Sequence, residues 1–260
     1  MSHNKYDNTI TSISKHMKTL LYSTSFSKSL ETWDNHFGRW INHLENSKLE
    51  YDQILLVDDG SPILPSWDGV EIIQEGNLPD TVPDSLAVIY HHEHNLGHNP
   101  PLKDGDPPID SPGWFRSYMF AAQYAAKYGF EKIILIESDA FLISDRIQDY
   151  VNNLTDGWTT FWCPRHQFAE NNIQITAGSS VQDFINWNLL AEPYEKYKGI
   201  YPEYFTPYTN VVKDFNGDRW GEFAPGMAAV PDPRCAPGVP RDADFVCQVR
   251  EVSPCWWIEQ

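Results

Sequence analysis

The stretch QILLVDDGS at residues 53–61 decides how this chain of 260 residues is organised. An unbroken apolar run that stops at turn residues predicts a strand covered on both faces, as in a parallel sheet. A second stretch of this kind, KIILIESD at residues 132–139, also ends in acidic residues. In open α/β sheets, ligands bind in the crevice beyond the carboxyl ends of the strands. Carboxylates at two such ends therefore predict a site for a divalent cation or a hydroxyl-rich ligand.

Helices and further strands are expected around these two stretches. Apolar residues recur at three- and four-residue spacing from Leu30 to Leu44, which predicts an amphipathic helix. A second helix is expected from Pro112, with Ser111 as its N-cap and Gly129 as its C-terminal cap. Other strands are expected at residues 18–24, 70–73 and 86–90. This alternation predicts an α/β fold, a single domain with a mostly parallel, Rossmann-like sheet flanked by helices.

The pattern weakens beyond residue 143. A short helix at residues 146–154, a strand at 158–163 and a helical region at 180–197 are expected there, followed by an irregular segment rich in Pro and Gly. We therefore divide the chain into a flexible leader (1–16), a half with the nucleotide-type sheet (17–143) and an irregular, substrate-facing half of the same domain (144–260).

Composition excludes several classes of protein. A formal net charge of -17 disfavours nucleic acid as a partner, because phosphate contacts need clustered Lys and Arg. An anionic substrate would need a counter-charge, most simply a bound metal ion. The four cysteines form no C-x-x-C pair, which argues against a zinc or disulfide framework. No apolar run approaches the ~20 residues of a membrane span, and no secretory segment is evident, so a cytoplasmic location is expected.

The motifs at the strand ends, taken in order, resemble those of the GT-A class of nucleotide-sugar glycosyltransferases, especially its large inverting family of polysaccharide synthases. The matching pieces are the turn at residues 57–61, the segment at 95–97, Arg116 on the helix from Pro112, and the ESD segment at 137–139. They cover about half of the chain. The first acid of the last motif is Glu137, where that family usually has Asp.

The resemblance implies a soluble, metal-dependent transferase that moves a sugar from a nucleoside-diphosphate sugar to a glycan or lipid-linked acceptor, in surface polysaccharide biosynthesis. Glu137 and Asp139 would hold Mn²⁺ or Mg²⁺, which prefer oxygen ligands. The remaining donor-binding residues would meet the base, ribose or phosphates: they are Thr24, Ser25, Asp58, Asp59, Asn95, Arg116 and Ser138.

An inverting transfer also needs a general base that takes the proton of the acceptor hydroxyl. Two acids in the segment at residues 215–223, Asp218 and Glu222, are equal candidates. Trp220 between them is a candidate platform for the acceptor sugar. His166 follows the acidic motif and is a candidate third metal ligand, because some enzymes of this class supply one from a late histidine.

Several alternatives remain open from sequence alone. The acids at 58–59 can simply close a strand-ending turn, and the acids near Arg219 can form an ordinary surface pair. The histidines at 91, 92, 94 and 98 suggest zinc, but equally a polar loop. At the level of function, the alternatives are a retaining transferase and a carbohydrate-binding or nucleotide-sugar-binding protein without turnover.

Overall fold

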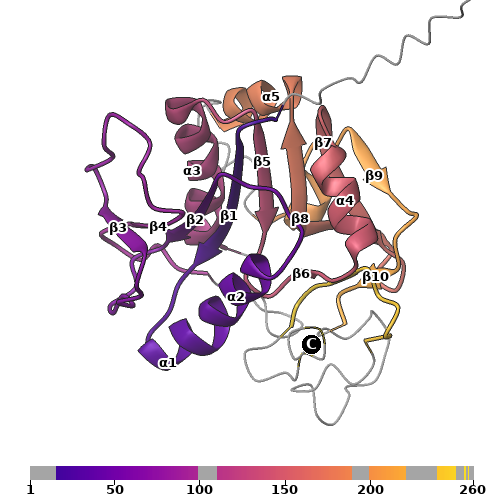
Figure 1. Ribbon diagram of the computed structural model, residues 1–260, viewed down its shortest axis with the longest axis horizontal. Helices are drawn as coiled ribbons and strands as arrows, with labels where there is room; N and C mark the ends of the chain where they lie inside the picture. The colour runs from indigo at the N-terminus through magenta and orange to yellow at the C-terminus, as the bar shows by residue number, and fades with distance from the viewer. Residues whose placement is uncertain are drawn as a thin grey trace, which may run out of the picture.

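The computed structural model describes residues 16–98, 110–188, 199–220, 239–249, 255 and 257. These residues form a central sheet of eight strands in the order β3-β4-β2-β1-β5-β8-β7-β9 (Figure 1). A smaller sheet has the order β10-β11-β6. The predicted leader lies outside the described residues except for His16. No helix in the described ranges is long and apolar enough to cross a membrane.

The first half of the chain forms the parallel part of the sheet, as the buried apolar runs predict. The strands are β1 (Thr19–Ser25), β2 (Gln53–Asp58), β3 (Val70–Gln74), β4 (Ala87–His91) and β5 (Lys132–Ile136). All pairings among them are parallel. The predicted α/β class with a mostly parallel sheet is therefore confirmed.

Two helical connections in this half match the predicted boundaries closely. The first runs from Leu30 to Glu45 as α1 (Leu30–Thr32), a π-helical segment η1 (Trp33–Gly38) and α2 (Arg39–Glu45). The second is α3 (Pro112–Tyr128), which ends at Gly129 in the left-handed conformation, as predicted. Ser111 occupies the N-cap position, as predicted, although its side chain makes no capping hydrogen bond.

The second half adds strands that run both ways. β8 (Phe168–Ala177) pairs antiparallel with β5 and with β7 (Gly157–Cys163), and β9 (Asn210–Val212) extends the edge. The helices are α4 (Asp145–Asn153) and α5 (Ser179–Asn188), with a 3-10 turn η2 (Pro202–Tyr204). The small sheet consists of β6 (Phe141–Leu142), β10 (Gly217–Asp218) and β11 (Phe245–Val246). The predicted helical region at 180–197 is observed as far as Asn188, and the rest lies outside the described residues.

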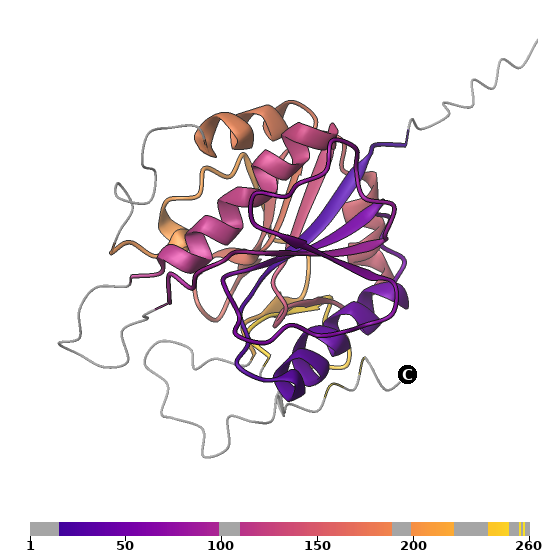
Figure 2. The ribbon, with the colours of Figure 1, turned by 90° about the vertical axis from the view of Figure 1, so that its left-hand side faces the viewer.

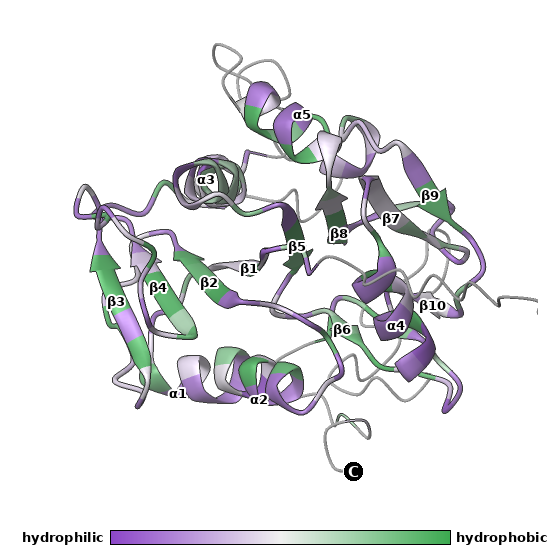
Figure 3. Cartoon of the chain, turned by 45° about the horizontal axis from the view of Figure 1, so that its top comes forward, coloured by the Kyte–Doolittle hydropathy of each residue, from purple (hydrophilic) through white to green (hydrophobic). Residues whose placement is uncertain are grey.

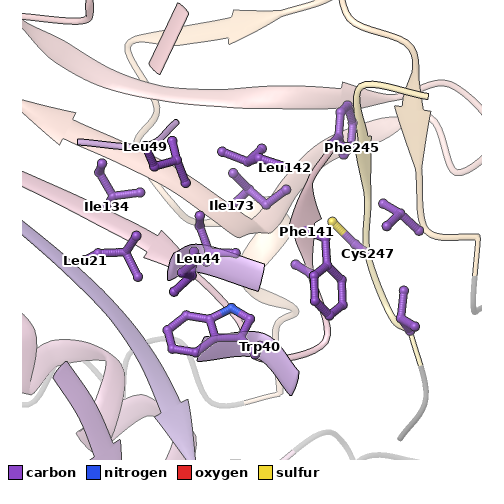
Figure 4. Packing of buried hydrophobic residues seen from close by; sticks show 14 of the residues in the cluster. Leu21, Trp40, Leu44, Leu49, Ile134, Phe141, Leu142, Ile173, Phe245 and Cys247 are labelled. Carbon is purple, nitrogen blue, oxygen red and sulfur yellow. The ribbon is translucent and has the colours of Figure 1, made fainter. Parts of the chain in front are cut away.

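Helices cover both faces of the central sheet, which explains why β2 and β5 are buried at every position. α3 and α5 lie on one face, and α1, α2, α4 and β6 lie on the other (Figures 2 and 3). Successive residues of β1 point to opposite faces. Leu20 and Tyr22 join the core under α3, whereas Leu21 joins the core under α2 together with Trp40 and Phe141 (Figure 4).

The topology places a crevice between β1 and β5. From β1 the chain proceeds through α1 and α2 on one face to β2, and from β4 it returns through α3 on the other face to β5. The connections from these neighbouring strands therefore leave in opposite directions, which is the switch point where ligands bind in such sheets. Pairing of β1 with β5 ends at Tyr22 and Leu135, although β1 continues beside β2 to Ser25. The two strands part there.

Candidate functional site

A cavity of about 510 Å³ opens at this switch point. Thr24 lines it from the end of β1, and Glu137, Ser138 and Asp139 line it from the end of β5. Aromatic side chains from several elements form much of its wall: Phe26, Phe37, Trp114, Phe115, Tyr201 and Phe205. Aromatic faces beside carboxylates suit a sugar, whose rings carry both apolar C–H faces and hydroxyl groups.

Glu137 closes the gap between the parting strands. Its Oε2 accepts hydrogen bonds from the Thr24 hydroxyl at 2.8 Å, the Thr24 amide at 3.2 Å and the Ser23 hydroxyl at 3.2 Å. Its Oε1 accepts one from Trp114 Nε1 at 2.9 Å. Burial raises the pKa of Glu137, and these donors work in the opposite direction. Both oxygens are thus used within the protein, so the expected metal ligation by Glu137 is not favoured by this geometry.

Asp139 projects from the next turn and is only half-buried. Asn172 on β8 donates a hydrogen bond to its Oδ1 at 3.2 Å. The backbone also holds it, because the Val249 amide donates to the Asp139 carbonyl at 2.9 Å. Of the two carboxylates of the acidic motif that line the cavity, Asp139 is the less buried.

Ser138 meets His36, a residue that sequence reasoning did not select. The Ser138 hydroxyl lies 2.7 Å from His36 Nε2, and both residues line the cavity. His36 belongs to the π-helical segment η1, and such segments inside helices are frequent at functional sites.

Acidification is expected to destabilise the protein through His36. Burial, with a smaller effect of the Arg39 charge, lowers the pKa of His36 to about 4. In the unfolded chain its pKa is near 6.5, so between these values the unfolded state binds the extra proton. Stabilisation that is complete above pH 6.5 is therefore lost as the pH falls toward 4. We expect His36 to lower the free energy of unfolding by about 2–3 kcal/mol between pH 7 and pH 4.5, measured by urea unfolding.

The variant His36→Gln should lose less stability over the same pH range. The exposed control His94→Gln should lose as much as the wild type. Equal losses in all three proteins would contradict the prediction.

A buried charge network also contributes to the cavity wall. Arg219 donates from Nε and Nη2 to the Glu170 carboxylate, at 2.9 and 2.8 Å, and from Nη2 to Glu203 as well. Burial alone would raise the pKa of Glu170, but the Arg219 charge and hydrogen bonds bring it below its usual value. For Glu203 burial dominates, so its pKa is raised despite Arg219. Arg219 and Glu203 line the cavity.

Asp58, which the sequence analysis expected to meet the nucleoside, lies outside the lining of the cavity. It is fully buried at the end of β2 and accepts hydrogen bonds from the Ser61 amide at 2.8 Å and the Ser61 hydroxyl at 2.5 Å. His91 Nδ1 lies 2.7 Å from its Oδ2, and the Ser25 hydroxyl lies 3.4 Å from its Oδ1. Ser25 thus also faces Asp58 rather than the cavity. These contacts join the ends of β1, β2 and β4.

Asp59, Asn95 and Arg116 form a second group outside the cavity lining. Arg116 Nη2 donates to Asp59 Oδ1 and to the His94 carbonyl, and Asn95 Nδ2 donates to Asp59 Oδ2 at 2.8 Å. The α3 residue Gly113 leaves room for this group, because a Cβ there would lie 1.9 Å from Asp59 Oδ2. The sequence analysis expected all three to bind the donor, and in this structure their polar groups engage one another.

Asp218 and His166 pair with each other. His166 Nδ1 lies 2.6 Å from Asp218 Oδ1, and the Arg165 amide donates to Asp218 Oδ2 at 2.6 Å. Asp218 has no exposed surface and does not line the cavity, so this geometry does not favour it as the general base. Trp220 has Arg165 above its ring and packs against the core rather than lining the cavity. Glu222 lies outside the described residues.

The metal-ligand set expected from the sequence does not come together. No group of three or more His, Cys, Asp or Glu side chains in the described ranges is arranged to hold a metal ion, which applies to Glu137, Asp139 and His166 and to the histidines after β4. Of those histidines, His91 pairs with Asp58 and His92 with Glu75. A Mg²⁺ bound by one carboxylate together with substrate phosphates and water would require only Asp139.

Comparison with known proteins adds little to this geometry. The chain matches no known protein family, and no curated protein matches it. It is similar to a solved structure described as the crystal structure of a glycosyltransferase involved in the glycosylation of the major capsid of PBCV-1. That likeness covers 90% of this chain and 95% of the other, with 13% sequence identity and a TM-score of 0.40. At this level it carries no argument about residues or chemistry.

Proposed function

We propose that this protein is a glycosyltransferase that moves a sugar from a nucleoside-diphosphate sugar to a hydroxyl acceptor, within the cavity between β1 and β5. One observation carries the proposal: the cavity at the switch point has the acidic motif of residues 137–139 at one end and aromatic walls around it. The order of strand-end motifs along the chain supports the same activity. Their resemblance to polysaccharide synthases favours an inverting enzyme that builds surface glycans.

Each part of the cavity has a role in this proposal. Asp139 would provide the protein ligand for Mn²⁺ or Mg²⁺, which neutralises the diphosphate and stabilises the charge that develops as it leaves. Trp114 and Tyr201 would stack against apolar sugar faces. Glu137 would act indirectly, because its hydrogen bonds fix Thr24 and Trp114 in the wall.

A binding protein without turnover is the second candidate. It is favoured by the carboxylate of Glu137, whose oxygens are both occupied by protein donors. The two candidates differ in whether nucleoside diphosphate is released from the donor. Both predict binding at the same cavity, so binding alone does not separate them.

Replacement of Asp139 with Ala should abolish metal-dependent transfer. We expect nucleoside diphosphate release, measured over a panel of UDP-, GDP-, ADP- and TDP-sugars with Mn²⁺, to fall by about 10³-fold or more, because a metal ion is worth several kcal/mol of transition-state stabilisation. The thermal stabilisation of the wild type by Mn²⁺ and nucleoside diphosphate together should disappear in the variant.

The exposed Asp183 on α5 provides a matched control, and Asp183→Ala should behave like the wild type. Full release by Asp139→Ala would rule out the metal role of this residue. Stabilisation by nucleotide without release from any donor would favour the binding protein. For an active protein, the anomeric configuration of the product would separate an inverting from a retaining reaction.

A further inference from the structure

Glu203 differs from the other acids of the cavity in the hydrogen bonding of its carboxylate. It lies on the turn η2, and its side chain is only 6% exposed. Arg219 Nη2 donates to Oε1, whereas Oε2 is buried and has no hydrogen-bond partner among the described residues. A buried carboxylate oxygen without a donor is costly, and such an atom in a cavity wall is available to a ligand that brings its own hydrogen.

Among the described residues, the charged groups around Glu203 carry one more negative than positive charge. Arg219 and Glu170 are the charged side chains that the structure places against it there, one cation and a second carboxylate. Glu170 binds Arg219 through two parallel hydrogen bonds, the bidentate geometry that makes such an ion pair strong. A proton accepted by Glu203 would make the buried network neutral. Burial raises the pKa of Glu203 accordingly.

The other acids of the cavity are less suited to accept a proton. Glu137 already receives four hydrogen bonds. Asp139 is the proposed metal ligand, and a coordinated carboxylate is a weaker base. Asp218, expected as the base from sequence, has no exposed surface and is paired with His166.

We propose that Glu203 is the general base of this cavity, and that Arg219 and Glu170 position it; this inference rests on the proposed transferase activity. In the step, the O–H bond of the acceptor breaks and its proton moves to Oε2 of Glu203. The oxygen forms a bond to the anomeric carbon of the donor, and the bond from that carbon to the diphosphate breaks, its electron pair leaving with the diphosphate. The substrate class follows: an acceptor with a neutral hydroxyl group, not one already ionised.

The test compares Glu203→Gln with the wild type and with Glu50→Gln, a matched change at an exposed glutamate. Transfer is measured as product formed from the nucleoside-diphosphate sugars of the panel and simple glycoside acceptors, from pH 5 to pH 9. We expect Glu203→Gln to reduce transfer by about 10²- to 10⁴-fold, the range for general base catalysis. Its thermal stabilisation by Mn²⁺ with nucleoside diphosphate should remain, and the acidic limb of the pH profile should disappear.

The outcomes separate this inference from the proposed function. Transfer by Glu203→Gln within threefold of the wild type overturns the inference and leaves the transferase standing. A wild type that forms no product from any donor overturns the proposed function, and the inference falls with it. If Glu203→Gln does not fold, Glu203→Asp serves instead, and an unchanged rate and acidic limb in that variant would also overturn the inference.

Discussion

Replacement of Arg219 with Met is expected to lower the free energy of unfolding by about 3–5 kcal/mol, because removing one partner of a buried ion pair leaves uncompensated charge behind. Arg219 is the cation between Glu170, whose side chain has no exposed surface, and Glu203, which is 6% exposed. Without it, two carboxylates would share a water-poor wall. Urea unfolding at pH 7 measures the effect, and the exposed Lys28→Met should stay within about 0.5 kcal/mol of the wild type.

A double variant identifies the cause of that loss. If buried charge is responsible, adding Glu170→Gln to Arg219→Met should recover at least about 1 kcal/mol, since one of the two stranded charges is removed. The same Glu170→Gln change in the wild type should instead be destabilising. A double variant that is less stable than Arg219→Met would indicate that lost packing over Phe168, whose ring lies 4.7 Å from the Arg219 guanidinium carbon, is the larger effect.

The first half of the fold was predictable because its signals are local. Buried parallel strands are continuous apolar runs, and β2 and β5 are buried at every position. The helix α3 carries a Pro at its start and Gly129 at its end, so both boundaries could be predicted from neighbouring residues. The π-helical segment η1 was not predictable, because Trp33 and Phe37 have the spacing of an ordinary helix.

The strand β8 was missed because many of its buried residues are polar. Gln174 is 2% exposed and accepts hydrogen bonds from Tyr118 and Trp158, which come from distant parts of the chain. Glu170 is buried because Arg219 compensates its charge. A polar residue can be buried when a partner satisfies it, and that partner cannot be identified from local periodicity.

The same limit explains which site residues could be predicted. The rule that ligands bind beyond strand ends correctly selected Thr24, Ser138 and Asp139 as lining residues. It did not distinguish a carboxylate that faces the cavity from one that closes its own turn, as Asp58 does. Glu203 and Arg219 lack any strand-end signal, and their link to Glu170 exists only in the folded chain.

Replacement of Asp58 with Ala is expected to cost about 3–5 kcal/mol of stability, since it leaves several buried donors without an acceptor. The Ser61 amide and hydroxyl and the His91 ring nitrogen all bond to this carboxylate, which has no exposed surface. Asp58→Asn should cost less because it keeps the shape and one oxygen. The exposed Asp84→Ala is the control and should leave stability unchanged.

The ligand response of the Asp58 variants separates a structural from a nucleoside-binding role. A residue that joins strand ends affects binding only through folding, so folded Asp58→Asn should gain the same thermal stabilisation from Mn²⁺ and nucleoside diphosphate as the wild type. A residue that holds the base or ribose would give the reverse: little loss of stability, and no response to nucleotide. The reverse result would restore the interpretation drawn from the DDGS turn and would place the nucleoside beside the end of β2.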